Sequence, residues 1–286
     1  MLKVENLYYT YAKNDNPTIK GISFEVKPGK IIGFLGPSGA GKSTVQKIII
    51  RLLSGYKGDI EVSGKKLQDW NLKDYYEYIG VGFELPNHYL KLTALENLNL
   101  FGSFYSCPIK FDHLLEQVGL AEHKNKRVEE FSKGMKMRLN FVRAFMHDPK
   151  LIFLDEPTSG LDPVSARNLK NIIIEQKRKG KTIFLTTHNM YDAEELCDQV
   201  GFIVDGELKV MDNPATLKRE GFTPKVVLKY KNDESFEKEF DLQGIGQNEN
   251  FIKTLKNTDY TIESINTKKT TLEDVFIKVT GANLSK

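Results

Sequence analysis

Cysteine and long apolar runs are both scarce in this sequence. Its 286 residues include two cysteines, Cys107 and Cys197, whose spacing fits neither a disulfide framework nor a metal site. We therefore expect two reduced and mostly buried thiols. No stretch reaches the roughly 20 consecutive apolar residues that span a bilayer, and Met1–Glu5 does not open an apolar stretch of signal-peptide length. These absences predict a cytosolic protein that is not itself a channel.

An excess of charge of either sign is also absent. The chain has 41 lysine and arginine residues against 38 aspartate and glutamate residues, which gives a formal net charge of +3. A protein dedicated to nucleic acid carries a strong positive excess, so we expect no nucleic-acid partner. The length fits one large domain, or one domain with a small appendage, on a prior of about 100 to 200 residues per domain.

A strand, loop and helix unit is predicted near the N-terminus. Ile22–Val26 and Lys30–Leu35 have the composition of strands and are separated by a turn signal at residues 28 and 29. A glycine-rich loop follows directly. Val45–Leu53 then has the length and apolar density of a buried helix, which Gly55 should end.

The next part of the chain is predicted to be a helical insert of about residues 88–148. Helix N-cap signals occur at Thr93, together with Glu96, and at Ser132. No strong strand pattern interrupts them.

Two buried strands after this insert end in polar side chains. Leu151–Leu154 is followed by Asp155 and Glu156, and Thr182–Thr187 is followed by His188. Short apolar runs of this kind are typical of parallel strands, whose carboxyl ends carry the ligand groups of α/β sheets. A helix is predicted between the two strands. Asp162 is its expected N-cap, Pro163 its first residue, and Gly180 the signal that ends it.

From about Gly221 the sequence predicts a small separate domain, residues 221–286. Val226–Tyr230 and Ser235–Phe240 suit strands of a half-exposed antiparallel sheet. The last helix should begin at a capping box formed by Thr270 and Glu273. Its predicted apolar face consists of Leu272, Val275, Phe276 and Val279.

The loop of residues 36–44 fits the phosphate-binding pattern G-x-x-x-x-G-K-[ST], and it has the required strand before it and helix after it. Its glycines let backbone N–H groups point at phosphate oxygens, and the helix N-terminus adds a positive dipole end. Lys42 can reach the β- and γ-phosphates, and Ser43 can ligate Mg²⁺. The motif predicts a nucleoside triphosphate site made of Gly36, Pro37, Ser38, Gly39, Ala40, Gly41, Lys42, Ser43 and Thr44.

The residues that end the two buried strands supply the remaining chemistry. Asp155 can hold the Mg²⁺ shell, and Glu156 is the natural general base for an attacking water. His188 can contact the γ-phosphate or orient the water. The alternatives are a solvated acidic turn for the carboxylates and a structural role for the histidine.

In combination, the motifs resemble those of ATP-binding cassette (ABC) ATPases. They are residues 36–44, Phe131–Met135, Leu154–Asp162 and Thr187–His188, and the match covers about residues 1–220. The resemblance implies an α/β fold: a P-loop NTPase (RecA-like) core with an antiparallel β subdomain and a helical insert, followed here by the small C-terminal α+β domain. It also implies a head-to-tail dimer with two ATP molecules between the cassettes.

Residue by residue, the resemblance gives Tyr11 the role of stacking on adenine, with Tyr9 as a nearby competitor. Ser132 and Gly134 would contact the γ-phosphate bound by the other subunit. Asp162 would lie in the loop that links the two sites across the dimer.

Two residues depart from the family pattern. Glu84 stands where most cassettes have glutamine, so it can accept a Mg²⁺ or water contact but adds a negative charge beside the phosphates. Lys133 stands where glycine is usual, and its cation either favours the phosphate or points to solvent. Metal affinity and the timing of hydrolysis depend on these two positions.

A transporter ATPase fits the sequence better than two other ABC classes. A chromosome-maintenance ATPase would carry a long coiled coil, and a translation factor would carry each motif twice. The run Thr271–Gly281 resembles the ending of cassettes from ABC-2-type exporters for drugs, antibiotics or polysaccharides. We therefore expect an ATPase that uses ATP and Mg²⁺, pairs with itself or a related cassette, and docks on a separate permease at the inner face of the membrane. A regulatory, non-transport ATPase is the alternative.

Overall fold

The computed structural model describes residues 1–12, 15–219, 224–232, 234–268 and 270–281. It forms two compact units: unit 1 comprises Met1–Pro214 with the residues from Val279 onward, and unit 2 comprises Ala215–Lys278. The domain boundary expected between residues 220 and 221 lies outside the described residues and stays a prediction. Across the described ranges, no helix has both the length and the apolar character needed to cross a membrane.

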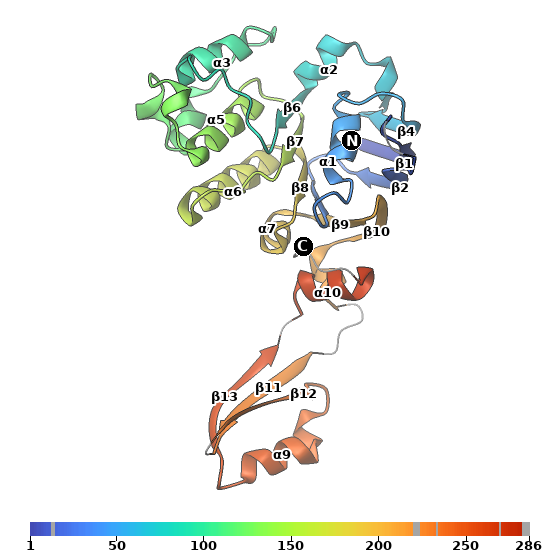
Figure 1. Ribbon diagram of the computed structural model, residues 1–286, viewed down its shortest axis with the longest axis vertical. Helices are drawn as coiled ribbons and strands as arrows, with labels where there is room; N and C mark the ends of the chain where they lie inside the picture. The colour runs from blue at the N-terminus through green and yellow to red at the C-terminus, as the bar shows by residue number, and fades with distance from the viewer. Residues whose placement is uncertain (13–14, 220–223, 233, 269, 282–286) are drawn as a thin grey trace. The chain divides into compact units, whose positions relative to one another are not determined.

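A six-stranded sheet forms the centre of unit 1 (Figure 1). Its strands pair in parallel, except for the edge strand β10, which is antiparallel to β9. Every residue of β3, β7 and β8 is buried. For β7 and β8 this confirms the two predicted buried parallel strands. In spatial order the strands are β10 (Glu207–Asp212), β9 (Gln199–Val204), β3 (Ile31–Leu35), β8 (Thr182–Thr187), β7 (Leu151–Asp155) and β6 (Ile79–Gly82).

A second sheet in unit 1 is antiparallel. Its order is β2 (Ile19–Val26), β1 (Leu2–Tyr9), β4 (Lys57–Val62) and β5 (Lys65–Lys66). The alternation of buried and exposed residues along β1 and β2 gives this sheet one apolar face. Phe24 of β2 packs its ring 4.8 Å from Phe34 of β3 and 5.9 Å from Phe184 of β8, so the two sheets share one core.

Helices surround these sheets, and α3 packs beside α5 in the helical insert (Figure 1). Thr93 forms the predicted capping box with Glu96, and Ser132 caps α5. The helices of unit 1 are α1 (Lys42–Ile49), α2 (Leu72–Tyr78), α3 (Ala94–Gly102), α4 (Asp112–Gln117), α5 (Lys133–Phe145), α6 (Pro163–Arg178) and α7 (Met190–Leu196). Short 3₁₀ helices are η1 (Leu67–Asp69), η2 (Ala121–His123) and η3 (Val128–Glu130).

The helix after the glycine-rich loop differs from the prediction. It begins at Lys42 rather than Val45, because Gly41 adopts a left-handed conformation, φ 108°, directly before it. It ends at Ile49 rather than Leu53, because Arg51 takes a positive φ of 63°. The prediction placed the stop at Gly55, but the chain turns before that residue.

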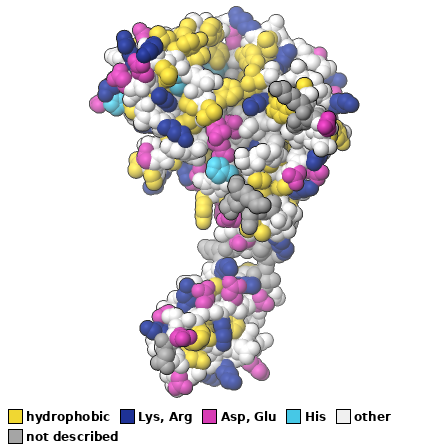
Figure 2. Space-filling view, viewed as in Figure 1, with side chains coloured by type: hydrophobic (Ala, Val, Ile, Leu, Met, Phe, Trp, Pro, Cys, Tyr) yellow, Lys and Arg dark blue, Asp and Glu magenta, His cyan; other side chains and the backbone are white. Residues whose placement is uncertain are grey.

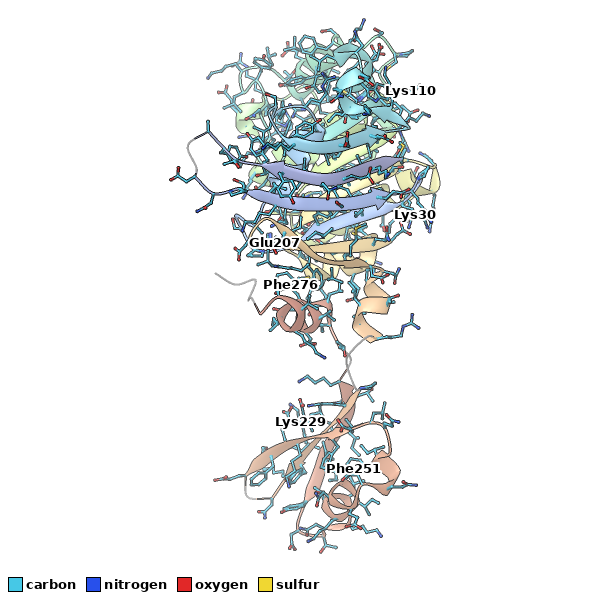
Figure 3. All side chains as sticks on the ribbon, turned by 90° about the vertical axis from the view of Figure 1, so that its right-hand side faces the viewer. Lys30, Lys110, Glu207, Lys229, Phe251 and Phe276 are labelled. Atoms are coloured by element: carbon cyan, nitrogen blue, oxygen red, sulfur yellow. The ribbon has the colours of Figure 1, made fainter. Side chains whose placement is uncertain are left out.

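Unit 2 contains an antiparallel sheet in the order β12 (Ser235–Asp241), β11 (Lys225–Lys231) and β13 (Thr261–Lys268). The two predicted strands correspond to β11 and β12. Phe251 of α9 (Glu249–Lys256) lies 5.2 Å from Phe240 of β12, ring to ring (Figure 3). The sequence did not predict β13 or α9. This unit also holds η4 (Ile245–Gln247) and most of α8 (Pro214–Arg219).

The last helix, α10 (Leu272–Thr280), begins one residue away from the predicted cap. Thr271 Oγ1 accepts a hydrogen bond from Asp274 N at 3.1 Å, and Asp274 Oδ2 accepts one from Thr271 N at 2.9 Å. The prediction of a capping box at Thr270 and Glu273 was therefore wrong. The pair Thr271 and Asp274 has the same spacing one residue later, and this pair forms the box. Three of the four predicted apolar residues are buried, but Val279 is 44% exposed.

Candidate functional site

The glycine-rich loop joins the end of β3 to the start of α1, as its motif requires. A Cβ on Gly36 would lie 2.0 Å from Ile203 O, so only glycine fits where β3 passes β9. The Lys42 side chain folds back over the loop, and Nζ donates hydrogen bonds to Gly36 O at 2.6 Å and to Pro37 O at 3.0 Å. Burial lowers the pKa of Lys42, and nearby carboxylates oppose this effect. The loop thus presents a buried cation with neutral carbonyl partners.

Asp155 ends β7 and contacts two hydroxyl groups. Ser43 Oγ donates to Asp155 Oδ1 at 3.1 Å, and Thr186 Oγ1, from β8, donates to the same oxygen. The first turn of α1 and the ends of two parallel strands therefore meet at one carboxylate. The sequence predicted Ser43 and Asp155 as Mg²⁺ ligands, and that role stays a prediction.

Glu156 follows in a strained turn with φ 47°, a conformation that is uncommon outside glycine. Its backbone N donates to Thr186 O at 3.0 Å. Glu156 is only 8% exposed. Its carboxylate has two polar neighbours. Thr187 Oγ1 donates to Oε2 at 3.1 Å, and His188 Nδ1 lies 2.9 Å from Oε1. The carboxylate is therefore held in one orientation.

These groups line one cavity of about 360 Å³. In Figure 2, acidic side chains lie beside a histidine side chain on the visible face of unit 1. The three predicted catalytic residues and all three predicted metal ligands are among the lining residues. The full set is Ser38, Gly39, Ala40, Gly41, Lys42, Ser43, Thr44, Glu84, Asp155, Glu156 and His188. Gly36 and Pro37 shape the loop from behind without lining the cavity.

The two candidate tyrosines have different surroundings. Tyr9 is buried in the core at 9% exposure, with its ring 4.9 Å from that of Tyr11. Tyr11 is half-buried, and its hydroxyl lies 3.2 Å from Thr44 Oγ1 at the end of the phosphate loop. Tyr11 is therefore the aromatic ring placed beside the loop, although it does not line the cavity itself.

The residues that the resemblance assigns to the contact between subunits, Ser132, Gly134 and Asp162, lie outside this cavity, as does Lys133. Ser132 is exposed, and its Oγ accepts a hydrogen bond from Met135 N at 3.2 Å. The exposed Lys133 side chain runs over Gly160, where a Cβ would lie 3.1 Å from Lys133 Cε. Asp162 caps α6, and Oδ1 accepts from Val164 N at 3.0 Å and from Ser165 N at 2.9 Å. None of these groups, nor Gly134, is among the residues that line the phosphate site of the same chain.

Sequence reasoning missed the hydroxyl groups that orient the carboxylates. Thr186 and Thr187 end β8 directly before His188, and Thr186 pairs in register with Asp155 of β7. The signal in the sequence was the two hydroxyl residues that end the predicted buried strand. It also missed Asp192, whose Oδ2 accepts from Thr158 Oγ1 at 2.5 Å and from Asn189 Nδ2 at 3.2 Å. That contact ties the loop after Glu156 to the turn after His188.

A phosphate loop between a strand and a helix, with carboxylates at the end of a neighbouring parallel strand, defines a P-loop nucleoside triphosphatase. Residues 19–159 match the family model described as "ABC transporter". The chain belongs to the ABC transporter family and is an ATP-binding, ATP-hydrolysing member of it.

Named relatives and solved structures agree with this assignment. The chain is 46% identical to the fluoroquinolones export ATP-binding protein of Mycobacterium tuberculosis over 100% of this chain and 95% of the relative. It is 37% identical to the bacitracin transport ATP-binding protein BcrA of Bacillus licheniformis, over 73% of this chain and 68% of the relative. The ATP-binding cassette MJ0796, solved as a dimer bound to ADP and Pi, is 25% identical with a TM-score of 0.67, covering 74% of this chain and 98% of that chain.

Proposed function

We propose that this chain hydrolyses ATP to drive the export of an antibiotic or other drug-like compound through a separate membrane permease. The observation that carries the proposal is the 46% identity, over the whole chain, with a protein named for fluoroquinolone export. The named antibiotic-transport relative BcrA also supports it. Since that full-length match includes unit 2 as well as unit 1, the likeness extends beyond the nucleotide cavity.

In the proposed reaction, the triphosphate of ATP lies along the loop of residues 38–44. Lys42 exchanges its two carbonyl partners for β- and γ-phosphate oxygens. Glu156 accepts the proton of the attacking water, an effect typically worth about 10²- to 10⁴-fold in rate. Thr187 and His188 hold the two oxygens of that carboxylate, so the base is oriented before the water arrives.

The residues present fit Mg²⁺, which takes oxygen ligands and keeps several waters and phosphate oxygens in its shell. Ser43 Oγ and Asp155 Oδ1 are 3.1 Å apart, and Glu84 lines the same cavity. We propose these three residues as the metal ligands. When bound, the ion neutralises charge that develops on the phosphate oxygens.

We propose that a second copy of the chain completes the site. Ser132 and Gly134, at the exposed start of α5, would face the γ-phosphate held by the partner copy, where backbone N–H groups of a helix N-terminus favour an anion. Lys133 would add a cation there, and Asp162 would lie in the loop between the two sites. Tyr11 would stack on adenine. Closure of the two copies on ATP, and reopening after hydrolysis, would move the permease.

In this proposal, the chain binds its permease at the inner face of the membrane. The test is co-expression with a candidate permease from the same genome, followed by purification and transport into inside-out vesicles. We expect ATP-dependent uptake of a fluoroquinolone or another antibiotic, and stimulation of ATP hydrolysis by the same compound. An ATPase that neither binds the membrane protein nor transports would instead support the regulatory alternative.

A further inference from the structure

Asp192 is a buried acidic residue that has no role in the proposed reaction. It lies on α7 and is 7% exposed, and the other buried acidic residues in the described part of the chain are Asp155 and Glu156. Those two line the nucleotide cavity, whereas Asp192 does not. A carboxylate is costly to bury unless hydrogen bonds or ion pairs replace the lost water. The partners of Asp192 therefore show what this carboxylate holds together.

One oxygen of the Asp192 carboxylate accepts hydrogen bonds from two different segments. Oδ2 accepts from Thr158 Oγ1 at 2.5 Å and from Asn189 Nδ2 at 3.2 Å. Thr158 lies in the turn that follows Glu156, and Asn189 directly follows His188. A single oxygen atom thus joins the segment after the proposed base to the segment after the histidine.

The same two segments also meet at the Glu156 carboxylate, which accepts from Thr187 and faces His188. Asn189 N donates to Thr187 Oγ1 at 2.9 Å, so the contacts form a closed ring with Asp192. Glu156 keeps its positive φ within this ring, and a strained conformation of this kind persists only where the surroundings fix it. Loss of one side of the ring should therefore let the turn at Glu156 relax.

The other oxygen of Asp192 is paired with a cation on a neighbouring helix. Oδ1 lies 3.2 Å from Lys170 Nζ of α6, and Lys170 also donates to Glu195 of α7. Burial lowers the pKa of Lys170, but its hydrogen bonds to Glu195 and Asp192 outweigh burial and raise the pKa above its ordinary value. Lys170 is therefore charged and ties Asp192 to α6. All of these side-chain partners of the carboxylate are donors.

We propose that Asp192 is a positioning residue for ATP hydrolysis, and that it holds the turn after Glu156 and the turn after His188 in a fixed arrangement. The inference rests on the proposed function, because it needs the roles given there to Glu156 and His188. Asp192 acts through Thr158 and Asn189 and touches no reacting group. A misplacement of about 1 Å at a reacting group can cost about 100-fold in rate, so a contact outside the cavity is enough to change kcat.

The test measures ATP hydrolysis by the full chain carrying D192N, at saturating ATP and Mg²⁺. Asparagine turns an N–H group toward either Lys170 or the two donors of Oδ2, so one side of the contact is lost. We expect kcat to fall about 10- to 100-fold and the Kd for ATP to change less than about 3-fold, because Asp192 does not line the cavity. D192E keeps the carboxylate and should restore part of the rate.

The matched control is D198N. Asp198 is a half-buried aspartate that accepts from Ile31 N and lies beside Lys177, both at 2.8 Å, and it does not line the nucleotide cavity. D198N should lower the free energy of unfolding, as D192N does, but leave kcat unchanged. Urea unfolding measures the first effect. A fall in kcat as large in D198N as in D192N would show that both changes act through stability, and would overturn the inference.

Two milder variants test the path and do not depend on whether D192N folds. T158V removes the hydroxyl but keeps the shape of the side chain, and N189S removes the amide donor but keeps an N-cap for α7. We expect each to lower kcat, and D192N to add no more than about 2-fold in a chain that carries both changes.

Unchanged kcat in either D192N or T158V would overturn the inference while the roles of Glu156 and His188 stand. A full further loss when D192N is added to T158V and N189S would also overturn it, because Asp192 would then act by another route. Undiminished turnover of E156Q would overturn the proposed base, and the inference with it.

Discussion

His188 Nδ1 lies 2.9 Å from Glu156 Oε1, at the ends of two neighbouring parallel strands. An imidazole nitrogen this close to a carboxylate oxygen is attracted only when it carries the proton. The contact therefore assigns a proton to Nδ1. The second ring nitrogen, Nε2, takes no part in the contact with Glu156. The same contact leaves the other carboxylate oxygen to Thr187, so both oxygens of the proposed base are oriented from β8.

Replacing His188 should slow hydrolysis without weakening ATP binding. We expect H188A to lower kcat by about 10²-fold and to leave the Kd for ATP within a few-fold, because the phosphate loop is unchanged. H188Q, which can still donate a hydrogen bond, should restore part of the rate. The control is H113A, because His113 is an exposed histidine on α4. A rise in Kd equal to the fall in kcat would show that His188 serves binding instead.

Replacing Glu84 should change how the site depends on magnesium. The negative charge of the Glu84 carboxylate raises the pKa of Lys42, although Glu84 is the last of the three carboxylates that do so. Two unit charges about 4 Å apart interact by about 1 kcal/mol when water screens them fully. We expect E84Q to bind ATP about 5-fold more tightly without Mg²⁺, and to need more Mg²⁺ for half-maximal hydrolysis. Titrations of ATP and of Mg²⁺ measure the two effects. Unchanged magnesium dependence would remove Glu84 from the proposed metal ligands.

The stability of the chain should fall in mild acid, in part because of His88. The folded state holds the pKa of His88 at about 4, against an ordinary value near 6.5. Between these values the unfolded chain binds the proton and the folded chain does not, so stability is fully present above pH 6.5 and is lost as pH falls toward 4. We expect unmodified protein to lose about 1 to 2 kcal/mol more than H88Q between pH 7 and pH 4.5. Urea unfolding at both pH values measures this, and equal losses would contradict it.

Replacing Asn140 should cost stability. Its side chain is 3% exposed and bonds both Phe83 O and Arg143. In N140L the half-buried carbonyl of Phe83 loses its partner, which we expect to cost about 1 kcal/mol. Urea unfolding measures the loss, and an unfolding free energy equal to that of the unmodified chain would contradict this prediction.

The sequence predicted the nucleotide cavity well, because its motifs carry their own local structure. The pattern of residues 36–44 needs a strand before it and a helix after it, and both were visible in the sequence. Asp155 with Glu156, and His188, were candidates because they stand at the ends of two runs that read as buried strands. Parallel pairing of those strands then brings the three side chains together.

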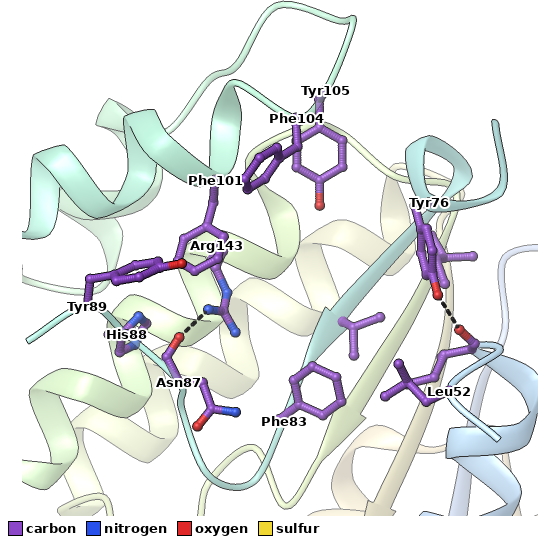
Figure 4. Close-up of a pocket in the computed structure, with 13 residues that line it drawn as sticks. Leu52, Tyr76, Phe83, Asn87, His88, Tyr89, Phe101, Phe104, Tyr105 and Arg143 are labelled. Atoms are coloured by element: carbon purple, nitrogen blue, oxygen red, sulfur yellow. Dashed lines mark hydrogen bonds between the residues drawn. The ribbon is translucent and has the colours of Figure 1, made fainter. Parts of the chain in front are cut away.

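Features that depend on competing local signals or distant contacts were not predicted. The spacing of a capping box fits both Thr270 with Glu273 and Thr271 with Asp274, and sequence alone does not choose between them. The end of α1 depends on the left-handed conformation of Arg51, a residue type that does not signal a turn. A second cavity, which Tyr76, Phe101 and Arg143 help to line (Figure 4), combines side chains from α2, β6, α3 and α5 and from segments beside them, so it exists only once the helical insert has packed.

The central claim is that the cavity of one chain is half of a site, completed by Ser132 and Gly134 of a second copy. The most direct measurement is the molar mass of E156Q in solution, by light scattering, with and without saturating ATP and Mg²⁺. Because this variant keeps ATP but lacks the proposed base, we predict the mass of one chain without ATP and of two chains with it. The added change S132D keeps the cap of α5 but places a negative charge against the phosphate, so E156Q with S132D should stay monomeric. A single-chain mass for E156Q with ATP bound would contradict the account.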